Sequence, residues 1–469
     1  MNEKCIFHID VNSAYLSWEA VYRQKYLGEP GDLRRQIAVV GGDEKLRRGI
    51  VLAKSIPAGK YGIKTGQSLL EARQKYPGLT IVSPDYDLYE RCSSALMALL
   101  SRYSPCVEQY SIDEAFVDMT EVLPLWQSID GAGNFNGAGT VNGGAPPGGC
   151  AVPSGTSAEP PGASAEPSAN AAPSGVSSPP PANPRLHTAQ NATLTAAEHI
   201  RAHISRELGF TVNIGISTNK VLAKMASDFQ KPDRIHTLYP HEIPYKMWPL
   251  PVGDLFFVGR ATKNKLEKLG IRTIGELAAT DAALLHYHFK KHGTVIRAFA
   301  NGLDASVVMD TPPPAKGYGN STTIAMDVDN EAAARLVLLK LAETLAARLR
   351  QDHVQIRVVA VGIKTSTFEF YSHQMVLENP TNITNEIYQY ACRLFGQCWR
   401  GEPIRHLGIH TGQVSDFDRM RQLHMFDTTD YDKLAKMDAA VDEIRQRYGR
   451  NAILRAALLG GRMKNAKRD

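Results

Sequence analysis

YSIDEAFVDMT, residues 110–120, places two acids side by side in an otherwise apolar run. The apolar residues that follow Asp113 and Glu114 predict a buried strand, in which unpaired carboxylates would cost several kcal/mol. Neighbouring side chains of a strand point to opposite faces, so the two acids can share one site only at a turn or bend. Residues 111–115 therefore predict a hairpin tip, and a surface turn with solvated acids is the competing interpretation.

A third carboxylate, Asp10, ends another short apolar segment, in the stretch HIDVN at residues 8–12. Acids near strand ends commonly hold divalent cations, and Mg²⁺ prefers oxygen ligands. The three acids predict a shared cation site, provided that other parts of the chain support it.

Length and composition indicate a globular protein with about three or four domains in its 469 residues. The formal charge of +5 permits a nucleic-acid partner without requiring one. Six cysteines without a C-x-x-C pair predict reduced thiols. Neither a signal peptide nor an apolar run of about 18 residues is found, so we expect a cytoplasmic protein without a membrane anchor.

Residues 127–184 differ in composition from the rest of the chain, being almost entirely Gly, Ala, Pro, Ser and Asn. Such a segment cannot bury enough apolar surface to offset its ordering entropy, so we expect disorder. It lies between a strand pattern and a helix pattern, which favours an insertion within one domain; a domain linker is the alternative. The blocks around it predict an α+β core, a short all-helical block and a second α+β domain.

Three motifs in order carry a family resemblance: HIDVNSAY, YSIDEAFVD and GISTNKVLAKMAS followed by KPD. Together they resemble the core motifs of Y-family DNA polymerases, the DinB/UmuC translesion group. The resemblance implies an α+β multidomain right hand with a ferredoxin-like palm, small fingers, a helical thumb and a little finger. The expected bounds are palm 1–11 and 84–238, fingers 12–83, thumb 239–310, linker 311–320, little finger 321–414 and C-terminal tail 415–469. Within the tail, residues 431–449 have a helical pattern.

The resemblance implies a role for each site residue. Asp10, Asp113 and Glu114, with the backbone carbonyl of Val11, would hold two Mg²⁺ ions. Tyr15 matches the steric gate that excludes a ribose 2′-hydroxyl; a core aromatic is the alternative. Lys231 matches a lysine that contacts the triphosphate, against the alternative of a solvated loop lysine.

The fingers depart from the family pattern. Ile56 and Gly59 occupy the positions of a Tyr and an Arg that grip the triphosphate in many members. Lys54 or Lys60 could replace the Arg as a point charge, but without bidentate geometry. These departures predict a higher KM for dNTP and suggest the UmuC-like branch.

Two further segments predict macromolecular partners. LFFVGRATKNKLEKLG, residues 255–270, resembles a helix-hairpin-helix whose Val258, Gly259 and Arg260 would contact DNA phosphates, with Phe257 in place of the usual first glycine. A helical packing unit is the alternative. QLHMF resembles the bacterial sliding-clamp peptide, with Gln422, Leu423, Met425 and Phe426 as its contacts; a chance match is the alternative.

The sequence therefore predicts a monomeric, Mg²⁺-dependent DNA polymerase of low fidelity and low processivity, which takes dNTPs and primer-template DNA in translesion synthesis and the SOS response. A non-catalytic, clamp-tethered scaffold is the alternative, favoured only by the fingers departures. A nucleotide cyclase would explain the acids but neither the hairpin-helix block nor the clamp-like peptide. Lesion specificity, error spectrum and any need for accessory proteins cannot be read from the sequence.

Overall fold

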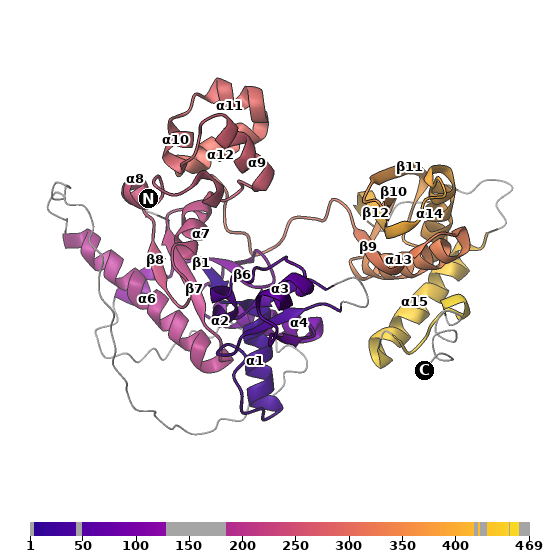
Figure 1. Ribbon diagram of the computed structural model, residues 1–469, viewed down its shortest axis with the longest axis horizontal. Helices are drawn as coiled ribbons and strands as arrows, with labels where there is room; N and C mark the ends of the chain where they lie inside the picture. Colours follow the sequence, from indigo (N-terminus) through magenta and orange to yellow (C-terminus); the bar gives the residue numbers. More distant parts are fainter. Residues whose placement is uncertain are drawn as a thin grey trace. The chain divides into compact units, whose positions relative to one another are not determined.

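The computed structural model describes residues 4–43, 49–127, 184–416, 421–422, 429–449 and 451–458 (Figure 1). The chain divides into two compact units. The first comprises Met1–Asp10 and Ala95–Val308, and the second comprises Val11–Ser94 and Met309–Asp469. The narrower domain bounds expected from the sequence remain a prediction.

A five-stranded sheet forms the centre of the first unit, with strand order β5-β6-β1-β7-β8. The middle strand, β1 (Ile6–Val11), is buried along its whole length and pairs antiparallel with β6 (Glu114–Asp118). The other strands are β5 (Val107–Gln109), β7 (Val212–Ser217) and β8 (Ile235–Thr237).

The hairpin predicted around Asp113 is confirmed. β5 ends at Gln109 and β6 begins at Glu114, and the two strands pair antiparallel. The backbone N–H groups of Tyr110 and Ser111 both donate to the Glu114 carbonyl, at 3.0 and 3.1 Å. Asp113 therefore lies in the turn, and Glu114 opens the strand that follows.

Helix α7 (Lys220–Asp228) follows β7 and packs closely against it, as Figure 1 shows. The side chain of Asn219 caps the helix by accepting a hydrogen bond from the Leu222 N–H at 2.9 Å. Gly215 of β7 makes the approach possible, because a Cβ at this position would lie 1.9 Å from the Ala223 carbonyl oxygen. This close packing brings the side chain of Lys224 on α7 to Glu114 at the start of β6.

Short helices after β8 share an apolar core with α7, because Leu222 and Met225 belong to the same buried cluster as Leu266 and Ile274. The thumb block is therefore attached to the sheet through α7. The remaining helices of the first unit are α5 (Leu123–Gln127), α6 (Pro184–Leu208), η1 (Pro240–Glu242), α8 (Ile243–Lys246), η2 (Val252–Asp254), α9 (Arg260–Lys268), α10 (Ile274–Ala279), α11 (Ala282–Phe289) and α12 (Lys291–Ala300).

The N-terminal part of the second unit holds a three-stranded sheet in the order β3-β2-β4. Val39, Val51, Ile63 and Leu69 form its apolar core. Its elements are α1 (Ala14–Tyr26), β2 (Ala38–Gly41), β3 (Val51–Lys54), α2 (Ile56–Lys60), α3 (Leu69–Lys75) and β4 (Thr80–Val82). Helix α4 (Tyr86–Leu100) runs from this part into the first unit.

The C-terminal part of the second unit is a four-stranded antiparallel sheet in the order β11-β10-β12-β9, with α13 and α14 packed against it (Figure 1). Helix α15 is joined to α13 by ion pairs from Arg350 to Asp438 and Asp442. The elements are β9 (Gly319–Val328), α13 (Glu331–Gln351), β10 (Val354–Thr365), β11 (Phe370–Thr381), α14 (Thr384–Cys398), β12 (Ile404–Asp416) and α15 (Tyr431–Tyr448).

The interior of the predicted insertion, residues 128–183, lies outside the described residues. The helices on either side of it, α5 and α6, pack against each other within the first unit. None of the described helices combines the length and the apolar character needed to cross a bilayer.

Candidate active site

Asp10 and Glu114 are direct cross-strand partners in the register of β1 and β6. Directly opposed residues of an antiparallel pair have Cα atoms about 4.5–5.5 Å apart, and their side chains leave the same face of the sheet. Asp113 immediately precedes Glu114 in the turn. The fold thus brings the early acid to the acidic pair.

Asp10 and Glu114 each form an ion pair with a lysine. Lys231 Nζ lies 3.0 Å from Asp10 Oδ2 and 2.9 Å from Asp228 Oδ1. Lys224 Nζ lies 2.9 Å from Glu114 Oε1. The residue predicted to contact the triphosphate, Lys231, is therefore adjacent to the first predicted metal ligand.

The surroundings shift the pKa values of Asp10 and Glu114 in opposite directions. Burial raises the pKa of Asp10 above its ordinary value, although Lys231 acts in the opposite direction. Burial alone would also raise the pKa of Glu114, but the hydrogen bond from Lys224 and the nearby His8 side chain outweigh it and lower the pKa. Glu114 is thus held as a carboxylate.

Asp113 makes a local contact, accepting a hydrogen bond from Ser111 Oγ at 2.8 Å, and it is half-buried. Within the part of the chain that the structure describes, no group of three or more His, Cys, Asp or Glu side chains is arranged to hold a metal ion. The donor chemistry nevertheless fits Mg²⁺, because two register-paired carboxylates and a third beside them offer only oxygen ligands.

Tyr15, the predicted steric gate, is half-buried in the first turn of α1. Its ring stacks on that of Tyr89, with ring centroids 4.4 Å apart. The ring centroid of Trp18 lies 5.9 Å from that of Tyr15. The Tyr15 ring is therefore supported by aromatic neighbours, and its role as a gate stays a prediction.

A lysine lies beside Gly59, the position at which many members of the family have an Arg. A Cβ on Gly59 would lie 2.9 Å from Lys54 Nζ, so the glycine leaves room for this ammonium group. Lys60 ends α2 and is exposed, and Ile56 is 52% exposed. Of the two candidate replacements, Lys54 is the one whose ammonium group lies beside Gly59.

The predicted phosphate-binding hairpin connects η2 to α9. Val258 is buried, Gly259 is the N-cap of α9, and Arg260 is the exposed first residue of the helix. Phe257 has a φ of 74°, a left-handed conformation that costs a non-glycine residue about 1–2 kcal/mol. Its ring packs edge-on against Phe256, with centroids 4.8 Å apart.

Of the predicted clamp-binding residues, only Gln422 is described; Leu423, Met425 and Phe426 lie outside the described residues. The backbone N–H of Gln422 donates to Asn379 Oδ1, and its carbonyl accepts from Asn379 Nδ2, both at 2.9 Å. Arg421 forms an ion pair with Glu386. The start of the peptide is therefore attached to the little-finger block.

Sequence reasoning missed three residues that support the site: His8, Lys224 and Tyr89. His8 is fully buried, with Nδ1 2.8 Å from Ser227 Oγ and Nε2 3.8 Å from Glu114 Oε2. Lys224 belongs to a motif already singled out, one helical turn after Lys220, and this spacing was the available signal. Nothing in the sequence marked Tyr89.

Comparison with known proteins adds independent observations. The impB/mucB/samB family profile matches residues 9–228, and the profile of that family's C-terminal domain matches residues 315–425. A DNA polymerase IV of Clostridium acetobutylicum is 40% identical over 456 residues, covering 97% of this chain and 98% of that protein. DNA polymerase IV 2 of Bacillus subtilis is 32% identical over 467 residues, covering 98% and 95%.

The fold has a counterpart among solved structures. A Y-family DNA polymerase chimera, Dbh-Dpo4-Dbh, superposes with a TM-score of 0.63 over 88% of this chain and 99% of its own, at 17% identity. The expected right-hand fold is confirmed.

One expectation needs correction. The relatives are named DNA polymerase IV, which points to the DinB-type branch rather than to the UmuC-like branch. The wrong expectation rested on Ile56 and Gly59, but a loss of two fingers residues does not define a branch. The chain belongs to the impB/mucB/samB family of Y-family DNA polymerases.

Proposed function

We propose that this chain is a template-directed DNA polymerase that adds deoxynucleotides to a primer 3′-hydroxyl with two Mg²⁺ ions and copies damaged template. The observation that carries the proposal is the cross-strand pairing of Asp10 with Glu114 in a chain of this family. The resemblance to this family also implies low fidelity and distributive synthesis. The proposal therefore includes a role in translesion repair.

Asp10, Asp113, Glu114 and the carbonyl of Val11 would hold the ions. When bound, two Mg²⁺ ions lower the pKa of the primer hydroxyl and neutralise charge on the triphosphate. The chain's own contribution is positioning. The ion pair of Lys231 with Asp10 supports a role for this lysine as the cation that meets the triphosphate beside the metal site.

The remaining predicted contacts belong to the same proposal. Tyr15 would exclude ribonucleotides, and Lys54, with Lys60 nearby in sequence, would meet the triphosphate from the fingers. Val258, Gly259 and Arg260 would bind backbone phosphates at the start of α9, without reading sequence. Gln422, Leu423, Met425 and Phe426 would bind a bacterial sliding clamp, and the polymerase would act as a cytoplasmic monomer.

A primer-extension assay with Mg²⁺ tests the proposal. The wild-type chain should extend the primer, and the double variant Asp113→Ala with Glu114→Ala should lose extension almost completely. Glu108→Ala is the matched control, because Glu108 lies on the neighbouring strand and pairs with Lys220 rather than facing Asp10. A wild-type chain that binds primer-template DNA but does not extend it would favour the clamp-tethered scaffold.

A further inference from the structure

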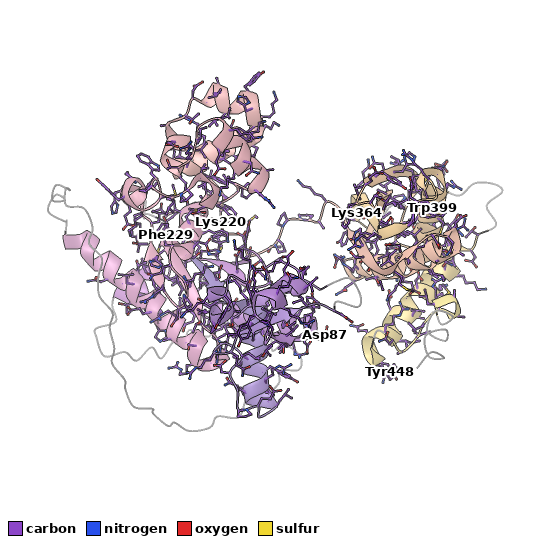
Figure 2. The ribbon with its side chains drawn as sticks, in the orientation of Figure 1. Asp87, Lys220, Phe229, Lys364, Trp399 and Tyr448 are labelled. Atoms are coloured by element: carbon purple, nitrogen blue, oxygen red, sulfur yellow. The ribbon has the colours of Figure 1, made fainter. Side chains whose placement is uncertain are left out.

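Two lysines on one face of α7 make parallel ion pairs with the β5–β6 hairpin. Lys220 Nζ lies 2.7 Å from Glu108 Oε1, and Lys224 Nζ lies 2.9 Å from Glu114 Oε1. The two lysines are four residues apart, so their side chains leave the same side of the helix. Lys220, labelled in Figure 2, lies at the start of α7. The two pairs have similar geometry, but only Glu114 faces Asp10.

The surroundings of Lys224 restrain its ammonium group. The side chain is 11% exposed. Its Nζ lies 5.4 Å from the centre of the Tyr110 ring and 5.5 Å from that of Phe256. Tyr110 belongs to the turn that carries Asp113, and Phe256 belongs to the thumb hairpin next to Phe257. A long side chain held by one carboxylate and two rings has little rotamer freedom left, so it restrains the carboxylate that it contacts.

We propose that Lys224 is a positioning residue for the polymerase reaction, which fixes the orientation of the Glu114 carboxylate and links it to the thumb hairpin through Phe256. The inference rests on the proposed function. A fixed lysine does not attract cations, since its positive charge opposes them. Its value lies in keeping a catalytic carboxylate from rotating, because small misplacements of reacting groups reduce rates strongly.

The test compares Lys224→Met, Lys224→Gln and Lys224→Arg with Lys220→Met as the matched control. Lys220→Met breaks a similar, partly buried ion pair on the same helix, but with an acid that is not a proposed ligand. Three quantities are measured on the full chain. They are kcat and KM for single-nucleotide insertion at saturating Mg²⁺, the melting temperature, and Mn²⁺ binding followed by electron paramagnetic resonance of free Mn²⁺.

For Lys224→Met we expect kcat to fall about 10-fold to 100-fold while Mn²⁺ binds at least as tightly as in the wild type. Lys224→Arg, which keeps the charge and the donors, should come nearest to the wild type, followed by Lys224→Gln. Lys220→Met should keep the wild-type kcat even where its melting temperature falls. Should Lys224→Met not fold, Lys224→Gln and Lys224→Arg provide the same comparison.

Either of two kinetic results would overturn the inference: a kcat that simply follows the melting temperature across all four variants, or equal kcat values in Lys224→Met and Lys220→Met. Loss of Mn²⁺ binding in parallel with kcat would also contradict it, because Lys224 would then shape the whole site. A wild-type chain without primer extension would instead refute the proposed function, and this inference with it.

Discussion

The ring of Tyr15 stacks on the ring of Tyr89, with centroids 4.4 Å apart and an interplanar angle of 8°. Tyr89 is fully buried, and its hydroxyl donates to Glu19 Oε1 at 2.8 Å. Burial and that hydrogen bond raise the pKa of the Tyr89 phenol, so it remains a neutral donor. Tyr89 is therefore a rigid base for the proposed sugar gate.

Replacing Tyr15 by Ala should raise ribonucleotide incorporation while primer extension with dNTPs continues, because removal of the ring makes room for a 2′-hydroxyl. The measurement is the ratio of kcat/KM for a dNTP and the matching ribonucleotide. An unchanged ratio would refute the gate assignment.

The stack itself can be tested at Tyr89. Tyr89→Leu removes the flat surface under Tyr15 and should relax sugar selectivity part of the way toward the Tyr15→Ala value. Tyr89→Phe is the control, since it keeps the ring and loses the hydrogen bond to Glu19. It should leave selectivity unchanged while lowering stability by about 1–3 kcal/mol, because a buried acceptor loses its donor. Equal selectivity in Tyr89→Leu and Tyr89→Phe would argue against the stack as a support.

The space at Gly59 predicts how the fingers compensate for the missing Arg. Gly59→Ala places a methyl group 2.9 Å from Lys54 Nζ, and the flexible lysine end can move aside without unfolding the domain. We expect a severalfold higher KM for dNTP and a nearly unchanged kcat, both in Gly59→Ala and in Lys54→Met. Lys60→Met serves as the comparison. A higher KM in Lys60→Met, with an unchanged KM in Lys54→Met, would identify Lys60 as the functional cation.

The sequence predicted what local patterns determine: the strands that carry Asp10 and Glu114, the turn at Asp113 and the helix at residues 431–448. Alternating and helical periodicities are local, so they can be read directly. The ion pair of Glu114 with Lys224 could not be predicted from the sequence, because it depends on how closely α7 approaches β7 at Gly215. The stacking of Tyr15 on Tyr89 likewise arises only when α1 and α4 pack together.

The proposed clamp contact predicts that substitutions in the peptide reduce clamp-stimulated synthesis selectively. Met425→Ala with Phe426→Ala should abolish the stimulation of synthesis by a sliding clamp and leave distributive synthesis intact, because apolar anchors carry most of the affinity of such peptides. Primer extension with and without the loaded clamp measures both. If both activities fell equally, these residues would be supporting the fold instead.

A partly buried cluster of aromatic and histidine side chains, next in sequence to the predicted insertion, should make stability depend on pH. His199 Nδ1 on α6 shares a 3.1 Å hydrogen bond with the Tyr103 hydroxyl, and its ring lies 5.3 Å from that of Trp126. Burial lowers the pKa of His199 below 6.5, and the nearby charges of His203 and Arg206 act in the same direction.

Because the folded state favours neutral His199, its contribution to stability is present above pH 6.5 and is lost as the pH falls below that value. The melting temperature of the wild type should therefore fall more between about pH 7.5 and about pH 5.5 than that of His199→Gln, which cannot take up the proton. His241→Gln, at an exposed position, is the control and should keep the wild-type pH dependence. Identical slopes for His199→Gln and the wild type would show that protonation of His199 does not oppose folding.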